Sequence, residues 1–146
     1  MAERVVFDTN IWISGLMWRG KPYQCLLLAR TVVVQALRCQ EIVAELTHKL
    51  RQVFGFSENH IHAVAQDLRR MGENAEITGD LRVVATDPDD DKFGECAVIG
   101  RAAMVVSGDH HLLDLDEYQG IRILSAAEFI AHFTESEGIA EEEWSF

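Results

Sequence analysis

The chain has 146 residues, of which 48% are hydrophobic, two are proline and three are cysteine, and its formal net charge is −11. This length is enough for one domain with a sizeable core, and the composition excludes a disordered chain. No apolar run approaches the roughly 20 residues that a membrane span needs, and the N-terminal segment is unlike a signal peptide. The three cysteines lie far apart in apolar settings, as expected of reduced thiols in a cytoplasmic protein. We therefore expect one domain over residues 1–134, no membrane segment, and an acidic tail over residues 135–146.

The negative charge argues at first sight against a nucleic-acid partner. Five glutamates, however, lie in the predicted tail, and five more acids belong to the cluster described below. Without these ten residues the surface would be close to neutral. The charge therefore permits a substrate that carries phosphate, although it does not indicate one.

The first half of the chain predicts short apolar strands that alternate with helices. Pro22 suits the first turn of a helix, and Ser57 is a natural N-cap. In chain order the pattern predicts a strand at 4–7, helices at 11–17 and 23–30, a strand at 31–37, a helix from Glu41 and a helix after Ser57.

The second half continues this alternation. Residues 93–103 are rich in small side chains, as expected of a helix that packs tightly on a sheet. Ser125 and Glu128 form a capping box that opens the last helix. The predicted elements are a short strand at 81–85, a helix at 93–103, a strand at 104–106, a helical turn at 110–115, a strand at 121–124 and a helix through Phe133.

Continuous apolar strands that alternate with helices indicate a parallel sheet covered on both faces. In such sheets, ligands bind beyond the carboxyl ends of the strands. Asp8 directly follows the first strand, and Asp109 follows the strand at 104–106. We therefore expect these two carboxylates to lie at the same edge of the sheet.

A dense acidic stretch lies in the middle of the chain, where Asp87, Asp89, Asp90 and Asp91 precede an apolar helical run. Such crowding of like charges is costly. It fits a solvated acidic turn, a cap for the following helix, or a cation site. The other acids of interest also have plain alternatives, since Asp8 and Asp109 suit helix N-caps and Glu45 suits a solvated helix face.

Taken together, four predicted elements would each bring one carboxylate to the same edge, namely Asp8, Glu45, Asp90 and Asp109. Clustered acids need a counter-charge, and no lysine or arginine lies near Asp8 or Asp109 in the sequence. A divalent cation is the simplest source of that charge. Oxygen ligands select Mg²⁺ or Mn²⁺ over zinc, and the favoured chemistry is phosphodiester hydrolysis by a metal-activated water.

Several segments resemble the motifs of PIN-domain nucleases in order and spacing. The opening motif is similar to Val5-Val6-Phe7-Asp8-Thr9-Asn10, and the second to Glu41-Ile42-Val43-Ala44-Glu45-Leu46. The third resembles residues 87–93 with Ala97 one turn later, the fourth resembles residues 106–109 with Leu112-Leu113, and the closing strand and helix resemble residues 121–129. Each motif alone is weak, whereas the ordered set is specific.

The resemblance implies a three-layer α/β/α sandwich with a central, mainly parallel sheet, and a Mg²⁺- or Mn²⁺-dependent endoribonuclease. It further implies the toxin of a VapC-type toxin–antitoxin pair, with an antitoxin partner and a homodimeric state. The metal-binding acids carried over from the family are Asp8, Glu45, Asp90 and Asp109, with Asp87 as a fifth and with Asn10 and Ser107 as supporting polar groups. Asp91 is a rival to Asp90, because the two side chains point about 100° apart at a helix start.

The substrate contacts are less specific in the sequence. Arg19, Lys21 and Lys92 lie near predicted strand-end loops and are candidates for contacts to RNA phosphates, although plain solubilising charge is the alternative. His110 and His111 are expected to be partly exposed loop residues, since an oxygen-rich site needs no imidazole. The alternative function is a metal- or RNA-binding module without turnover that acts through a protein partner.

Overall fold

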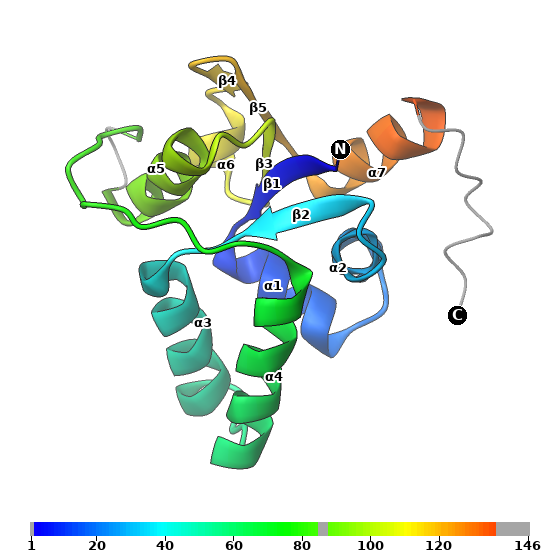
Figure 1. Cartoon of the computed structure of the whole chain (residues 1–146), viewed down its shortest axis with the longest axis vertical. Helices are drawn as coiled ribbons and strands as arrows, with labels where there is room; N and C mark the ends of the chain where they lie inside the picture. Colours follow the sequence, from blue (N-terminus) through cyan, green and yellow to red (C-terminus); the bar gives the residue numbers. More distant parts are fainter. Residues whose placement is uncertain (1, 85–87, 137–146) are drawn as a thin grey trace.

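The fold was analysed in a computed structural model of the chain, which describes residues 2–84 and 88–136 (Figure 1). The elements within these ranges are β1 (Glu3–Phe7), α1 (Thr9–Met17), α2 (Lys21–Arg30), β2 (Val34–Leu37), α3 (Gln40–Gln52), α4 (Glu58–Met71), the 3-10 turn η1 (Pro88–Asp90), α5 (Asp91–Gly100), β3 (Met104–Val106), α6 (His110–Leu113), β4 (Glu117–Tyr118), β5 (Ile121–Leu124) and α7 (Ala126–Ser136). The predicted acidic tail lies outside the described residues from residue 137 onward.

The strands form a mainly parallel sheet in the order β2-β1-β3-β5-β4. The strand β1 lies in the interior of the sheet, parallel to β2 and to β3, and β3 is parallel to β5. Only β4 pairs with its neighbour in the antiparallel direction. The register places Phe7 beside Val106, so the residues that follow β1 and β3 emerge side by side.

Helices cover both faces of the sheet, which confirms the predicted α/β/α sandwich (Figure 1). The helix α5 packs on β1, β2 and β3, whereas α2 and α7 contact β2 and β5 from the opposite face. The helices α3 and α4 contact each other and extend away from the sheet (Figure 1). None of the helices in the described ranges is long and apolar enough to cross a membrane.

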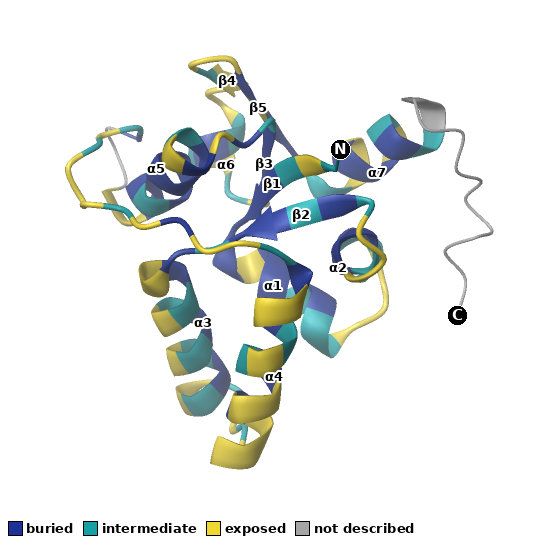
Figure 2. Ribbon diagram, in the orientation of Figure 1, coloured by how far each residue is buried: buried dark blue, intermediate teal, exposed yellow. Residues whose placement is uncertain are grey.

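The core is centred on β1, whose residues Val5, Val6 and Phe7 are fully buried (Figure 2). The Phe7 ring meets Trp12 of α1 and Phe129 of α7 edge to face, with ring centroids 5.4 and 5.8 Å apart. Such ring pairs stabilise a core beyond their buried area. The strand that ends at Asp8 is therefore fixed from several elements at once.

The small residues of α5 have the predicted role of close packing. A Cβ atom built on Gly100 would lie 2.5 Å from Cδ1 of Leu37 in β2, well inside the normal contact distance. The missing side chain at Gly100 therefore lets the helix pack closely on the sheet without displacing Leu37. The close approach fixes the height of α5, and so of the acids at its start, above the sheet.

Three details differ from the sequence predictions. The strand predicted at 31–37 begins only at Val34, because Val32 has a positive φ of 63° that breaks the extended backbone. Residues 81–84 are not a strand, and Ala85 lies outside the described residues. The short strand β4 was missed, although its two-residue connection Gln119-Gly120, with φ of 50° and 82°, has the positive φ values typical of tight hairpins.

Candidate metal centre

The four predicted acids line one open pocket of about 200 Å³ at the carboxyl ends of the strands. Asp8 follows β1 and Asp109 follows β3, while Glu45 comes from α3 and Asp90 from the end of η1. The remaining residues that line the pocket are Thr9, Asn10, Lys49, Asp89, Lys92 and Phe93. Four separate elements thus bring carboxylates to one place, as expected from the parallel sheet.

Asp8 is held firmly at the base of the site and is only 3% exposed. Its Oδ1 accepts a 2.8 Å hydrogen bond from the backbone N–H of Ile11, and its Oδ2 accepts from the Ser107 hydroxyl and the Gly108 N–H. Burial nevertheless raises the pKa of Asp8 above its ordinary value, against the effect of these hydrogen bonds. A cation beside this carboxylate would therefore stabilise its charged form.

Ser107 joins Asp8 to Asp109. Its hydroxyl donates to Asp8 and accepts a 2.9 Å hydrogen bond from the backbone N–H of Asp109, and the side chain is fully buried. The pKa of Asp109 lies below its ordinary value, chiefly because of a hydrogen bond with the Asp90 carboxyl group. Two carboxyl groups can share such a bond only with a proton between them. A metal ion would take the place of that proton.

The plain alternative for two of these acids, a helix N-cap, is also correct. Asp8 caps α1 through Ile11, and Asp109 caps α6 by accepting a 2.9 Å hydrogen bond from the His111 N–H at Oδ1. In each cap, the hydrogen bond goes to Oδ1, one of the two oxygens of that carboxylate. The cap fixes the orientation of the side chain, so capping and ion binding are compatible roles for the same residue.

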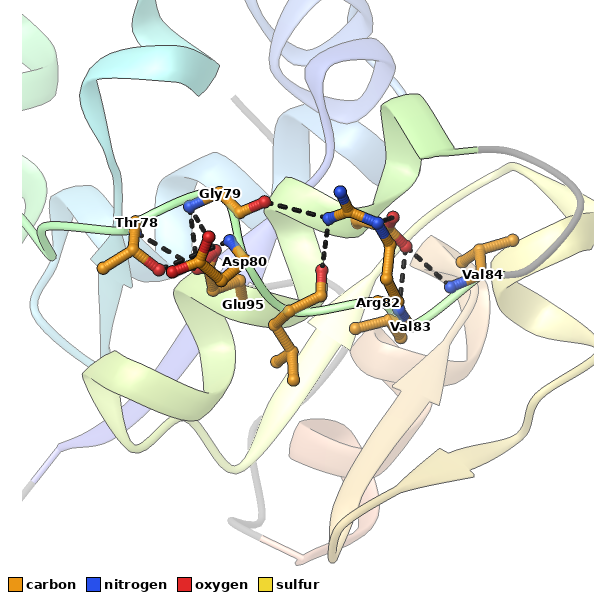
Figure 3. Close-up of polar contacts among 9 residues, drawn as sticks. Thr78, Gly79, Asp80, Arg82, Val83, Val84 and Glu95 are labelled. Carbon is orange, nitrogen blue, oxygen red and sulfur yellow. Dashed lines mark hydrogen bonds and ion pairs between the residues drawn. The ribbon is translucent and has the colours of Figure 1, made fainter.

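The structure shows which of the two candidate acids, Asp90 or Asp91, lines the pocket. Asp90 is buried and lines the acidic pocket. Asp91 does not line it, and instead its Oδ1 accepts 2.8 Å hydrogen bonds from the backbone N–H groups of Val83 and Val84 (Figure 3). Asp91 is therefore used to hold the preceding loop, and Asp90 is the member of the pair that faces the other acids.

A second buried acid, one turn later on α5, holds the same loop. Glu95 is 3% exposed and accepts from the backbone N–H groups of Thr78 and Gly79 and from the Thr78 hydroxyl, at 3.0 to 3.1 Å (Figure 3). Between the two anchors, a Cβ on Gly94 would lie 2.6 Å from Val83. The loop at 78–84 is thus fastened to the helix whose first residues follow Asp90. The sequence analysis missed Glu95, which belongs to no acidic cluster.

The structure also contains a counter-charge that the sequence analysis missed. The Lys92 ammonium lies 2.8 Å from Oε2 of Glu45, and a second lysine, Lys49, lines the same pocket. Burial is the largest single influence on Glu45 and opposes its ionisation, but the hydrogen bonds from Lys92 and Thr9 and the charges of Lys92 and Lys49 together outweigh it, so the pKa of Glu45 lies below its ordinary value. Lys49 follows Glu45 by four residues on α3, and this spacing was a usable signal.

The remaining predicted residues are placed differently. Asn10 lines the pocket and is exposed, whereas Arg19 and Lys21 do not line it. Arg19 lies over the Tyr23 ring, with its guanidinium carbon 5.6 Å from the ring centroid. Lys92 lines the pocket as part of the pair with Glu45. Asp87, the predicted fifth acid, lies outside the described residues.

The donor set of the pocket suits a hard divalent cation. Asp8, Glu45, Asp90 and Asp109 offer only oxygen, the ligand type that Mg²⁺ and Mn²⁺ prefer. His110 and His111 lie close by, since one atom from each and one carboxylate oxygen of Asp109 are within 4.8 Å of one another. His110 is exposed and His111 is partly exposed, as predicted, but both lie in the helix α6 and not in a loop, because the Asp109 side chain caps that helix.

Comparisons with known proteins agree with this architecture. A model of the PIN domain family matches residues 4–111. A search of the curated proteins found no match. The fold is an α/β sandwich of the PIN type, and the chain belongs to the PIN domain family.

Two solved structures are similar to the chain in fold. One is the crystal structure of VapBC2 from Rickettsia felis bound to a DNA fragment from their promoter, with a TM-score of 0.52 and 13% identity over 82% of this chain and 96% of that chain. The other is the PIN domain of RRP44 from T. brucei, with a TM-score of 0.53 and 14% identity over 94% of this chain and 84% of that chain. At these identities the similarity concerns the fold.

Proposed function

We propose that this PIN-domain protein is an endoribonuclease that depends on Mg²⁺ or Mn²⁺ and hydrolyses RNA phosphodiester bonds. The observation that carries the proposal is the convergence of Asp8, Glu45, Asp90 and Asp109 from four elements on one pocket. Membership of the PIN domain family supports the same chemistry. We propose these four side chains as the catalytic metal ligands, with Asp87 as a fifth acid.

The divalent ion, Asp8 and Ser107 have distinct roles in this proposal. A bound divalent ion would supply an activated water and would stabilise the charge that develops on the phosphate. Asp8 is held in one orientation by Ile11, Ser107 and Gly108, so it offers the ion a fixed ligand. Ser107 couples that orientation to the backbone at Asp109.

The polar residues at the rim of the pocket would contact the substrate. Asn10 is exposed at the rim, where its amide can hydrogen-bond a water or a phosphate oxygen. The ammonium of Lys49 lines the same pocket and suits a phosphate contact. Arg19 and Lys21 lie on the segment between α1 and α2, and we propose that they bind the RNA backbone farther from the reacting phosphate.

The proposal is tested by incubating the purified protein with single-stranded RNA and Mn²⁺. We expect cleavage that EDTA abolishes, and that is lost in Asp8→Asn and Glu45→Gln. Glu41→Gln is the matched control, because Glu41 lies exposed on the same helix as Glu45 and does not line this pocket. Equal cleavage by all four proteins would contradict the proposal. RNA or metal binding without any cleavage would favour the non-catalytic module.

We further propose that the protein is the toxin of a type II toxin–antitoxin pair and a cytoplasmic homodimer. The similarity of its fold to a chain of a VapBC2 complex supports a protein partner. An apolar surface suits such contacts, since Trp18 is 58% exposed and Val53 is 70% exposed, and the Trp18 ring contacts Phe54. Light scattering on the purified chain should give twice the monomer mass, and Trp18→Glu should shift it toward the monomer.

A further inference from the structure

The Lys92 ammonium is held at three points inside the acidic pocket. It lies 2.8 Å from Oε2 of Glu45, donates a hydrogen bond to the backbone carbonyl of Asp89, and lies 4.7 Å from the centroid of the Phe93 ring. The side chain is only 15% exposed. These contacts join α5 to α3 directly beside the other acids. Lys92 is therefore fixed where a positive charge is needed when the acids are ionised.

A lysine and a divalent ion at the same carboxylate interfere with each other. Both are attracted to Glu45, and like charges a few Å apart in a partly buried pocket repel strongly. The Lys92 ammonium lies 2.8 Å from Oε2 of Glu45, so it already supplies part of the attraction that an ion would provide. An ion that binds Glu45 must either displace the Lys92 ammonium or bind beside its positive charge.

We propose that Lys92 is a positioning residue that serves as the internal counter-ion of Glu45 and thereby weakens the binding of the divalent ion. The inference rests on the proposed metal-dependent function and deepens it by naming the residue that sets the metal affinity. Lysine suits this role, because its ammonium is a compact point charge on a flexible stem, so it can be held at Glu45 in the absence of an ion and be displaced when an ion binds there. When an ion takes Glu45, the ammonium remains beside the pocket, where it can contact a substrate phosphate.

The test is a calorimetric titration of Mn²⁺ into the wild type and variants without RNA. Lys92→Met removes the charge and keeps the apolar stem, and Lys92→Gln is a second neutral variant if the first folds poorly. We expect both to bind Mn²⁺ at least tenfold more tightly than the wild type, and Lys92→Arg to stay within about threefold of it. Lys49→Met is the matched control: it removes the same charge from the same pocket, and it should tighten binding less.

A second readout separates this role from a general structural one. In cleavage assays, Lys92→Met should lower the Mn²⁺ concentration that gives half-maximal activity, while the maximal rate falls because a phosphate contact is lost. Neutral variants that bind Mn²⁺ as weakly as the wild type, or more weakly, would overturn the inference and leave the nuclease proposal intact. A wild type that binds no Mn²⁺ would overturn both.

Discussion

Two groups of acids lie near the start of α5, and they differ in how the protein stabilises their negative charge. Asp91 and Glu95 accept hydrogen bonds from four backbone N–H groups of the loop at 78–84. Asp90, one residue before Asp91, faces the pocket that Asp8 and Asp109 also line. A buried carboxylate surrounded by N–H donors is stabilised by the protein itself, whereas carboxylates that face each other need a proton or a cation. The first group holds the loop, and the second is the group that we propose as metal ligands.

The largest expected effect comes from the same substitution at two adjacent positions. Asp90→Asn should lower cleavage by about 100-fold or more, since even residues that merely support metal ligands cost 10- to 100-fold when they are changed. Asp91→Asn keeps an acceptor oxygen for Val83 and Val84 and should leave cleavage close to that of the wild type. Initial rates at saturating Mn²⁺ measure both. Similar losses at both positions would remove the distinction between the two groups.

Glu95 should matter for stability. Glu95→Ala removes the charged acceptor of the part-buried hydrogen bonds from the N–H groups of Thr78 and Gly79, which should cost about 2 kcal/mol in the free energy of unfolding. Glu95→Gln retains one acceptor oxygen and should lose about half as much. Urea unfolding in EDTA measures both variants. An unchanged midpoint for Glu95→Ala would show that the loop is not held in this way.

Replacing Asp8 should stabilise the folded protein, whereas replacing Glu95 should destabilise it. Burial raises the pKa of Asp8 in the folded protein above its value in the unfolded chain. The Asp8 side chain therefore destabilises the folded protein when the pH is above this raised pKa and the carboxylate is charged. In EDTA at pH 7, Asp8→Asn should therefore increase the free energy of unfolding by about 1 kcal/mol while abolishing activity.

The pH dependence provides the control for Asp8. The advantage of Asp8→Asn should shrink as the pH falls toward 3.8, the ordinary pKa of the carboxyl group, because the wild-type side chain is then also neutral. Denaturant unfolding at pH 7 and pH 4.5 compares the two proteins. A less stable variant at pH 7 would show that hydrogen bonding outweighs burial at Asp8.

The smallest effect is expected far from both groups. In the capping box of α7, the Ser125 hydroxyl accepts from the Glu128 N–H at 3.2 Å, and Glu128 accepts from the Ser125 N–H at 3.0 Å. Ser125→Ala should cost about 1 kcal/mol in unfolding free energy and leave cleavage unchanged in the folded protein. A loss of cleavage at temperatures where the variant remains folded would contradict this expectation, because it would show an effect of the cap beyond stability.

The elements with strong local signals were predictable from the sequence. The N-cap at Ser57 and the capping box at Ser125 formed as expected, because their hydrogen bonds join residues three apart. The shared edge of Asp8 and Asp109 followed from the parallel sheet alone. These features depend on neighbours in the chain or on a general rule of topology.

Features that depend on contacts between residues far apart in the sequence could not be predicted from local patterns. The choice between Asp90 and Asp91 depends on where Val83 and Val84 direct their N–H groups, and these same bonds to a side chain explain why 81–84 is not a strand. The pairing of Lys92 with Glu45 joins residues 47 positions apart in the sequence. The expectation that a divalent cation is the simplest counter-charge for the acids was therefore incomplete, because Lys92 supplies part of that charge.

The order of the strands also determines when the pocket can first exist during synthesis. The bond between Ser107 and Asp8 spans 99 positions, and β1 cannot be enclosed in the sheet until β3 has been translated. A nascent chain therefore carries Asp8 from the outset but lacks Ser107 and Asp109 until the residues that follow β3 have been synthesised. The pocket proposed for the metal ion therefore cannot form before the residues that follow β3 have been synthesised.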